Sequence, residues 1–397
     1  MKYILSFISL FIMLPVFALD YGIDRLHEIE VTEKLKGKRL AALTHAAGRS
    51  KDGRHLIDEL HQNFNLKKIF APEHGLRTMA DDWVEDGQDE TTGLPVISLY
   101  KRGTRAPRAE DLKDIDAIVI DLQDVGVRYY TYFSTIAEVM KAVAPLKIEV
   151  IILDRPNLLG GLVMEGKVLD KELAGNFTAY HTIPTRHGMT LGELAKMINA
   201  ENNLGTQLTI IPARGWNRDY LLNQLDRAWD APSPALVSLD QVGLYALWGS
   251  LENFNLAVGR GQTNEEAFRV LGAPWITLSE SQELAQELNQ LLFAGIKFKA
   301  HQWKVSRSIY AGQVATGVRI DGDFSQIRTD EFTFKVASLL VAKFKERLNM
   351  NQMSPQTYGS HKLIAAIRRQ EQWEKIKNLI DQELVLFAQR RKPFLIY

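Results

Sequence analysis

The chain of 397 residues contains no cysteine, no excess of charge of either sign and no block of basic residues. Without cysteine, disulfide bonds, thiolate metal sites and a lipoprotein anchor are excluded. The 48 Lys and Arg residues balance the 48 Asp and Glu residues, so general attraction to nucleic acid or to an anionic membrane is not expected. An anionic ligand would have to be recognised by individual arginines.

Several common catalytic motifs are also missing. The chain has no phosphate loop, no Gly-rich dinucleotide fingerprint, no Gly-x-Ser-x-Gly nucleophile elbow and no His-Glu-x-x-His zinc motif. His74, His187, Asp124 and Asp154 could still form a metal site, but their spacing does not require one. We therefore expect neither a metal nor a cofactor.

The N-terminal segment has the features of a secretory signal. Lys2 supplies a short positive region, residues 3–17 are apolar, and Val16-Phe17-Ala18 fits the small-x-small cleavage pattern. Cleavage after Ala18 is predicted; the alternative is an uncleaved membrane anchor, for which the apolar run is short. The mature protein is expected to be periplasmic or secreted, without membrane attachment.

Three apolar runs in the first 160 residues each end in a polar cluster. Residues 68–71, 118–122 and 150–153 are rich in β-branched and aliphatic side chains, as in strands buried on both faces of a parallel sheet. Ligands of such open sheets bind at the carboxyl ends of the strands. The polar clusters that follow these runs should therefore converge on one carboxylate-rich cleft.

Strands and helices alternate from about residue 38, which indicates an α/β fold with a parallel sheet. The composition shifts at Ala231-Pro232-Ser233-Pro234. We expect a first domain over residues 19–235 that carries the cleft, and a smaller α+β domain over 236–397 that covers or buttresses it. The expected strands are residues 39–43, 68–71, 95–100, 118–122, 150–153, 208–211, 296–305 and 316–320, and the expected helices are residues 55–63, 132–143, 190–201, 280–292, 330–347 and 371–388.

Glu73 stands in the sharpest of the polar clusters, between Pro72 and His74-Gly75. At a strand end, next to a turn glycine, its carboxyl group would be held rigidly in the cleft and partly desolvated, which suits a general acid. Alternatively, Glu73 caps the next helix or pairs with His74.

The cluster after the 118–122 strand combines an amide, an acid, a guanidinium group and phenols in Gln123, Asp124, Arg128, Tyr130 and Tyr132. Aromatic rings suit the faces of sugars, amide and acid groups suit sugar hydroxyls, and an arginine can bind a carboxylate through two parallel hydrogen bonds. Alternatively, Asp124 and Arg128 form a structural ion pair and one tyrosine belongs to the core.

The loops after residue 153 carry five further candidates. At the strand-to-loop corner, Asp154 could orient another side chain and Arg155 could bind an anion beside Asn157, or the acid and the arginine form an internal pair. Glu165, on a Gly-rich loop, could swing over the cleft or remain solvated. His187 precedes a helix start and could face the site or cap that helix.

A last group lies in the second half of the chain. Glu252 and Asn255 lead into Gly259-Arg260-Gly261, where the glycines allow close approach of the backbone to a ligand and Arg260 presents one cation. A plain Gly-rich turn with a solvated arginine is the alternative.

Together these motifs resemble the NamZ-type exo-β-N-acetylmuramidases, which are exported bacterial glycosidases that remove terminal N-acetylmuramic acid from peptidoglycan fragments. The similarity runs from about residue 36 to the C-terminus. The matching segments include Ala71-Pro72-Glu73-His74-Gly75-Leu76-Arg77, Thr92-Gly93-Leu94-Pro95-Val96, Gln123-Asp124-Val125-Gly126, Asp154-Arg155-Pro156-Asn157, Glu165-Gly166, Arg186-His187-Gly188-Met189-Thr190, Gly259-Arg260-Gly261 and Gly272-Ala273-Pro274-Trp275.

The resemblance implies a Rossmann-like parallel-sheet N-terminal domain, a smaller C-terminal domain and an active site in the cleft. It implies Glu73 and Glu165 as the catalytic glutamates, supported by His74, Asp124 and His187. The substrate-binding residues would be Gln123, Arg128, Tyr130, Tyr132, Asp154, Arg155, Asn157, Glu252, Asn255 and Arg260, with Glu252 as the reserve candidate for a catalytic acid. Departures from the family pattern, such as Leu158 and Lys167 where proline is usual, concern substrate loops.

The hypothesis is therefore hydrolysis of a β-1,4 bond that releases N-acetylmuramic acid from peptidoglycan-derived muropeptides or disaccharides. One glutamate would protonate the leaving oxygen, and a second acid would activate water or act as nucleophile. Arg128, Arg155 or Arg260 would recognise the lactyl carboxylate. The main alternative is a non-catalytic muropeptide or sugar receptor, and a metal-dependent hydrolase comes third.

Overall fold

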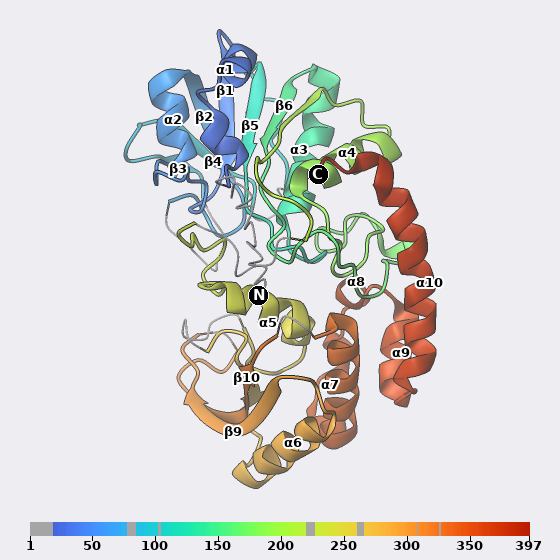
Figure 1. Cartoon of the computed structure of the whole chain (residues 1–397). Helices are drawn as coiled ribbons and strands as arrows, with labels where there is room; N and C mark the ends of the chain where they lie inside the picture. Colours follow the sequence, from blue (N-terminus) through green and yellow to red (C-terminus); the bar gives the residue numbers. More distant parts are fainter. Residues whose placement is uncertain are drawn as a thin grey trace, which may run out of the picture.

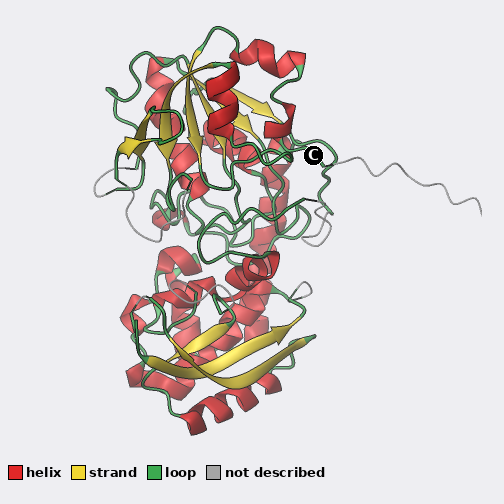
Figure 2. Ribbon diagram, turned by 90° about the vertical axis from the view of Figure 1, so that its left-hand side faces the viewer, coloured by secondary structure: helices red, strands yellow, loops and turns green. Residues whose placement is uncertain are grey.

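The computed structural model describes residues 19–77, 85–101, 105–219, 227–259, 266–307, 309–324 and 327–397. The predicted signal peptide, residues 1–18, and Arg260 lie outside these ranges. The chain builds a seven-stranded sheet first and a three-stranded antiparallel sheet afterwards, with helices packed on both (Figures 1 and 2).

The larger sheet has the strand order β3-β4-β2-β1-β5-β6-β7, and all its neighbouring strands are parallel except the edge pair β3 and β4. Its crossovers contain the helices that the alternating pattern predicts. The strands are β1 (Arg39–Thr44), β2 (Asn65–Ala71), β3 (Gly87–Gln88), β4 (Pro95–Ser98), β5 (Ala117–Asp121), β6 (Glu149–Leu153) and β7 (Leu208–Ile211).

Alternate residues of each central strand bury against opposite layers of helices. In β1, Leu40 and Ala42 belong to the core beneath α1 (Ile29–Leu35) and α2 (Leu56–Asn63). Ala41 and Leu43 belong to the core beneath α3 (Tyr132–Val143) and α4 (Leu191–Glu201). Burial on both faces explains why these strands are continuous apolar runs. The predicted α/β class with a smaller C-terminal part is confirmed.

The carboxyl ends of β2, β5 and β6 lie at one edge of the sheet, because these strands are parallel to β1 or to each other. Leu43 of β1 is paired with both Phe70 of β2 and Ile120 of β5, and Ile120 is paired with Ile152 of β6. The three polar clusters that follow these strands therefore begin at the same level of the sheet.

The chain then crosses to its second half, whose three-stranded sheet has the order β8-β10-β9. Figure 2 shows this sheet below the larger one, with helices against it. The elements are α5 (Leu239–Trp248), β8 (Val270–Ala273), α6 (Leu278–Gln290), β9 (Ile296–Lys304), β10 (Val314–Gly322), α7 (Thr329–Phe344), α8 (Pro355–Tyr358), α9 (His361–Arg369) and α10 (Trp373–Arg391).

Two tyrosines hold the segment at which the chain crosses. The hydroxyl groups of Tyr130 and Tyr132 both donate hydrogen bonds to the carbonyl oxygen of Pro232, at 3.0 and 2.9 Å. Residue 232 is thus anchored directly to the loop after β5, shortly before α5 begins.

A second crossing is made by α10, which runs back from the smaller part to the sheet (Figure 1). Arg390 near its end pairs with Glu201 of α4, and Arg391 donates to the carbonyl oxygen of Gly188 at 2.7 Å. The final residue, Tyr397, donates to Asp154 Oδ2 at 2.9 Å and accepts from the backbone N–H of Ala213 at 2.8 Å. The C-terminus is therefore built into the larger part.

Tyr397 influences the ionisation of Asp154. Burial raises the pKa of Asp154 to about 6, although hydrogen bonds from Thr190, Gly192 and Tyr397 favour the carboxylate. The unfolded value is about 3.9. Because the folded pKa is the higher one, this group contributes stability below about pH 4 that is lost as the pH rises through about 6.

We expect Tyr397→Phe to destabilise the protein more at pH 8 than at pH 4.5. The substitution removes a hydrogen-bond donor that favours the Asp154 carboxylate. The free energy of unfolding should therefore fall by about 2 kcal/mol when Asp154 is charged and by about 1 kcal/mol when it is protonated. Urea unfolding at the two pH values, followed by tryptophan fluorescence, measures the difference.

Tyr310→Phe is the matched control. The hydroxyl group of Tyr310 also has one donated and one accepted bond, to the carbonyl oxygen of Asn255 and from the indole N–H of Trp275, both at 3.0 Å. Neither partner titrates, so the Tyr310→Phe variant should lose the same free energy of unfolding at both pH values. Equal deficits for Tyr397→Phe at pH 4.5 and pH 8 would contradict the coupling to Asp154.

No helix within the described ranges is long and apolar enough to cross a membrane.

Candidate active site

A cavity of about 240 Å³ lies where the polar clusters of the sheet meet the smaller part of the chain. The larger part contributes Glu73 and His74 after β2 and the loop of Tyr129 to Thr131 after β5. The smaller part contributes Tyr245 of α5 and Glu252 of the short 3-10 helix Gly249–Asn253. The cavity thus brings together two glutamates that are 179 positions apart in the sequence (252 minus 73).

Glu73 is held at the cavity by its backbone and by one hydroxyl group. The next residue, His74, has a φ of 73°, a left-handed conformation that is unusual for a residue other than glycine and frequent at functional sites. Thr131, at the start of α3, donates from Oγ1 to Glu73 Oε2 at 2.6 Å. The carboxyl group is half-buried, so it is oriented yet remains accessible from the cavity.

A buried histidine that the sequence analysis did not single out supports this corner. His45, at the end of β1, accepts a hydrogen bond at Nε2 from the backbone N–H of Gln123 at 3.0 Å, and its Nδ1 lies 3.4 Å from the hydroxyl group of Tyr132. Burial lowers the pKa of His45 well below its usual value, so the ring is neutral. The ring therefore supports Tyr132 without adding charge next to Glu73.

Aromatic rings form much of the remaining wall. Tyr129 packs edge to face on Tyr245 with ring centres 5.3 Å apart, and Tyr245 packs likewise on Phe268 at 5.1 Å. Burial raises the pKa of Tyr129, and the charge of Glu252 raises it further although Arg128 opposes the shift, which indicates that Glu252 lies near this ring. The wall therefore offers aromatic rings for packing against a ligand, while the hydroxyl group of Tyr129 donates to the carbonyl oxygen of Tyr245.

Comparisons with known proteins decide the family. The description "Exo-beta-N-acetylmuramidase NamZ, N-terminal" matches residues 40–240, and "Exo-beta-N-acetylmuramidase NamZ, C-terminal" matches residues 243–397. The chain belongs to the NamZ family. A peptidoglycan beta-N-acetylmuramidase NamZ of Bacillus subtilis (strain 168) is 34% identical over 384 residues, which cover 95% of this chain and 91% of that protein.

Two solved structures of DUF1343 family proteins from Bacteroides fragilis NCTC 9343 have the same fold as this NamZ-family chain. One is 31% identical with a TM-score of 0.84, and the other is 26% identical with a TM-score of 0.74. Both similarities cover 96% of this chain and 99% of the other chain.

Glu165, the predicted second catalytic glutamate of this NamZ-family chain, does not line the cavity that Glu73 lines. Its Oε2 atom accepts from the backbone N–H of Thr329 at the start of α7, at 3.1 Å, and lies 3.4 Å from Nη1 of Arg186. The structure therefore places Glu165 at a helix start in the contact between the two parts of the chain, rather than over the cleft.

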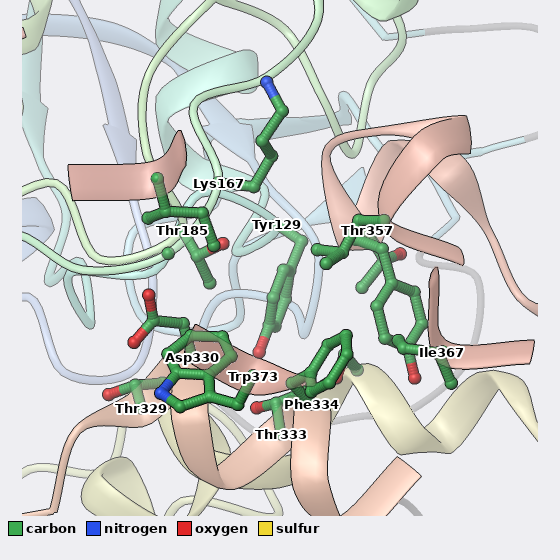
Figure 3. A pocket seen from close by; sticks show the side chains of 15 residues that line it. Tyr129, Lys167, Thr185, Thr329, Asp330, Thr333, Phe334, Thr357, Ile367 and Trp373 are labelled. Atoms are coloured by element: carbon green, nitrogen blue, oxygen red, sulfur yellow. The ribbon is translucent and has the colours of Figure 1, made fainter. Parts of the chain in front are cut away.

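The neighbours of Glu165 line a second, smaller cavity of about 30 Å³ on the other side of Tyr129. Figure 3 shows this cavity, with the ring of Tyr129 between Thr185 and Thr357 and with Asp330 and Trp373 below it. Its volume is enough for only one or two water molecules. It cannot hold a sugar, so Tyr129 separates the candidate active site from a buried packing region.

Neither of the two described arginines that were predicted to recognise the lactyl carboxylate reaches the cavity. Arg128 is buried and donates to the carbonyl oxygens of Lys167, Ile183 and Thr357 at 2.7, 3.0 and 2.8 Å. Burial lowers its pKa to about 10. Arg128 therefore braces three loops instead of presenting its charge to a ligand.

Arg155 is buried at the end of β6 and pairs with Asp121 of β5, with Nη2 at 2.7 Å from Oδ2. The predicted alternative, an internal pair with Asp154, does not form, since Asp154 accepts hydrogen bonds from Thr190, Gly192 and Tyr397. Both side chains at this corner stabilise the strand ends.

Asp124 and His187 are brought together, with His187 Nε2 at 3.4 Å from Asp124 Oδ2. Both are buried, and neither lines the cavity. Asp124 Oδ2 also accepts from the backbone N–H of Gly126 at 2.7 Å, and His187 Nδ1 accepts from that of Met189 at 3.2 Å. The pair shapes the loops behind the site, and the predicted ion pair of Asp124 with Arg128 does not form.

The three side-chain amides that were predicted to bind substrate donate to backbone carbonyl oxygens in the structure. Gln123 donates to the carbonyl oxygens of Asp124 and Pro156, and Asn157 donates to that of Met189 at 2.9 Å. The side chain of Asn255 donates to the carbonyl oxygen of Arg347 at 2.9 Å, a contact within the smaller part of the chain. None of these amides lines the cavity.

Among the described residues of the predicted set, those that reach the cavity are thus Glu73, His74, Tyr130 and Glu252, while Arg260 lies outside the described ranges. Sequence reasoning missed Tyr100, which closely follows β4, and Arg105 and Phe177, which lie on loops without regular periodicity. Among the described residues, no group of three or more His, Cys, Asp or Glu side chains could hold a metal ion.

Proposed function

We propose that the protein is an exo-acting glycoside hydrolase that releases N-acetylmuramic acid from the non-reducing ends of peptidoglycan fragments. Its membership of the NamZ family supports this activity. The observation that carries the proposal for this chain is that Glu73 and Glu252 line one cavity with an aromatic wall. Glycosidases use two carboxyl groups on either side of the scissile bond.

Glu73 is proposed as the general acid. The Thr131 hydroxyl group fixes one of its oxygens, at 2.6 Å, and the half-buried position keeps the carboxyl group within reach of a leaving oxygen. Proton donation by a positioned side chain is a common source of rate enhancement in glycoside hydrolysis.

Glu252 is proposed as the second carboxylate, in place of Glu165. It lines the same cavity as Glu73 and comes from the other part of the chain, whereas Glu165 does not line this cavity. A second carboxylate in the cavity would stabilise the oxocarbenium-like transition state or activate the attacking group. The proposed pair of carboxyl groups therefore needs both parts of the chain.

The size of the cavity supports removal of a single terminal sugar. At about 240 Å³ it is smaller than the roughly 300–1,000 Å³ of typical small-molecule pockets. One saccharide ring fits such a space better than an extended glycan. The apolar N-terminal segment supports export, so we place the activity in the periplasm or outside the cell.

Incubation with the disaccharide MurNAc-β-1,4-GlcNAc, followed by mass analysis, tests the proposal. We expect equal amounts of the two free sugars and, from longer chains, loss of the terminal MurNAc only. The activity should withstand EDTA, because the proposed chemistry uses two carboxyl groups and no metal. Binding of the disaccharide without turnover would instead support the sugar-receptor alternative.

A further inference from the structure

Arg105 extends into the cavity from the loop after β4 and is the one permanently charged cation among the described residues that line it. Its guanidinium carbon lies 4.5 Å from the centre of the Tyr100 ring and 4.9 Å from that of the Phe177 ring. Nη1 donates to the carbonyl oxygen of Lys101 at 3.0 Å. The two rings and this bond hold the guanidinium group in place.

This arrangement suits the binding of a carboxylate. The two rings attract the cation, and the N–H groups of a guanidinium group donate in its plane, in a fork that matches the two oxygens of a carboxylate. The side chain is half-buried, so its interaction with an anion is screened less than it would be at a fully exposed surface.

The charges of the cavity make such a cation necessary for an anionic ligand. Glu252, the proposed second carboxylate, lines the same space, and a ligand carboxylate entering it meets the repulsion of this group. Of the three arginines predicted for this task, Arg128 and Arg155 are buried against other partners, and Arg260 lies outside the described residues. Arg105 is placed to supply the compensating charge.

We propose that Arg105 binds the lactyl carboxylate of the terminal N-acetylmuramic acid and thereby selects this sugar over N-acetylglucosamine. The assignment rests on the proposed muramidase function and deepens it, because it names the residue that reads the group by which the two sugars differ. Tyr100 and Phe177 are positioning residues whose rings attract the guanidinium group.

The test compares two substrates that share an aglycone: 4-nitrophenyl β-N-acetylmuramide with a free lactyl carboxylate, and the same compound with that carboxylate converted to its methylamide. We expect wild type to prefer the acid by about 100-fold in kcat/KM, mainly through KM. Arg105→Gln should lose about 100-fold on the acid and little on the amide, so the preference disappears. Arg105→Lys should keep part of it.

Arg108→Gln is the matched control, since Arg108 lies outside the cavity and pairs with Asp111 and Glu110. Its preference for the acid should equal that of wild type. The unfolding midpoint of each variant is measured, because a merely structural role of Arg105 would lower the activity on both substrates equally. An equal loss of activity on both substrates overturns the inference. A wild-type protein that does not prefer the acid, or an Arg105→Gln variant that still prefers it, overturns the inference as well. A wild type that hydrolyses neither compound refutes the proposed function itself.

Discussion

Glu73→Gln is expected to lower kcat on the disaccharide MurNAc-β-1,4-GlcNAc by about 10⁴-fold, and on 4-nitrophenyl β-N-acetylmuramide by only about 10²-fold. Glutamine keeps the size of the side chain but cannot donate a proton to the leaving oxygen. A sugar alkoxide is a poor leaving group without a proton, whereas 4-nitrophenolate leaves readily. The ratio of the two losses, measured by steady-state kinetics, therefore reports proton donation specifically.

This ratio separates a general acid from a residue that only orients the substrate. If Glu73 served to position the sugar, both substrates would lose activity by the same factor. A Glu73→Gln protein that cleaves both substrates as fast as wild type would reject any catalytic role. Thermal unfolding should show a small change, because the Thr131 hydroxyl group can still donate to the amide oxygen.

Glu252→Gln is expected to lower kcat by about 10³-fold on both substrates alike. The proposed task of Glu252 is to stabilise the positive charge of the transition state or to activate the attacking group, and either step is needed whatever the leaving group. The same two substrates thus distinguish the two glutamates, because Glu73→Gln should lower kcat unequally on them and Glu252→Gln equally.

Glu165→Gln serves as the comparison for Glu252→Gln. Its Oε2 atom accepts from Thr329 and faces Arg186, so we expect a lower unfolding midpoint and a kcat within a few-fold of wild type. A loss of about 10³-fold with an unchanged midpoint would return Glu165 to the catalytic role that the family resemblance implied.

The sequence was sufficient for the class of the fold and the edge of the sheet that carries the site. Residues 208–211 and 132–143 have the predicted bounds, because their apolar patterns are bounded by clear polar or turn signals. In contrast, α5 was not predicted. It is apolar around most of its circumference, and a helix of that kind has no amphipathic period to detect.

The site was predictable only where a local signal existed. Glu73 follows a buried strand directly, and this position fixes it at the sheet edge. Arg128 follows a strand in the same way, but its partner Thr357 is 229 positions away, so no local pattern reveals that its charge is directed inward. The partners of Glu165 were hidden for the same reason, since Thr329 is 164 positions away.

Arg105, in contrast, lines the cavity but was not predicted to do so. It belongs to a polar loop without periodicity, and nothing in its neighbourhood marks it as different from Arg108. Its role emerges only from the rings of Tyr100 and Phe177, which come from separate loops.

The two halves of this protein are joined twice, once through the tyrosine-held backbone at Pro232 and once through α10 and its terminal Tyr397. Buried contacts lie between the two crossings, such as the hydrogen bond from Arg128 to Thr357 and the packing of Tyr129 on Tyr245. Both ends of the smaller half are therefore attached to the half that carries Glu73, so a cut through α10 should loosen the alignment of Glu73 and Glu252 without touching either residue.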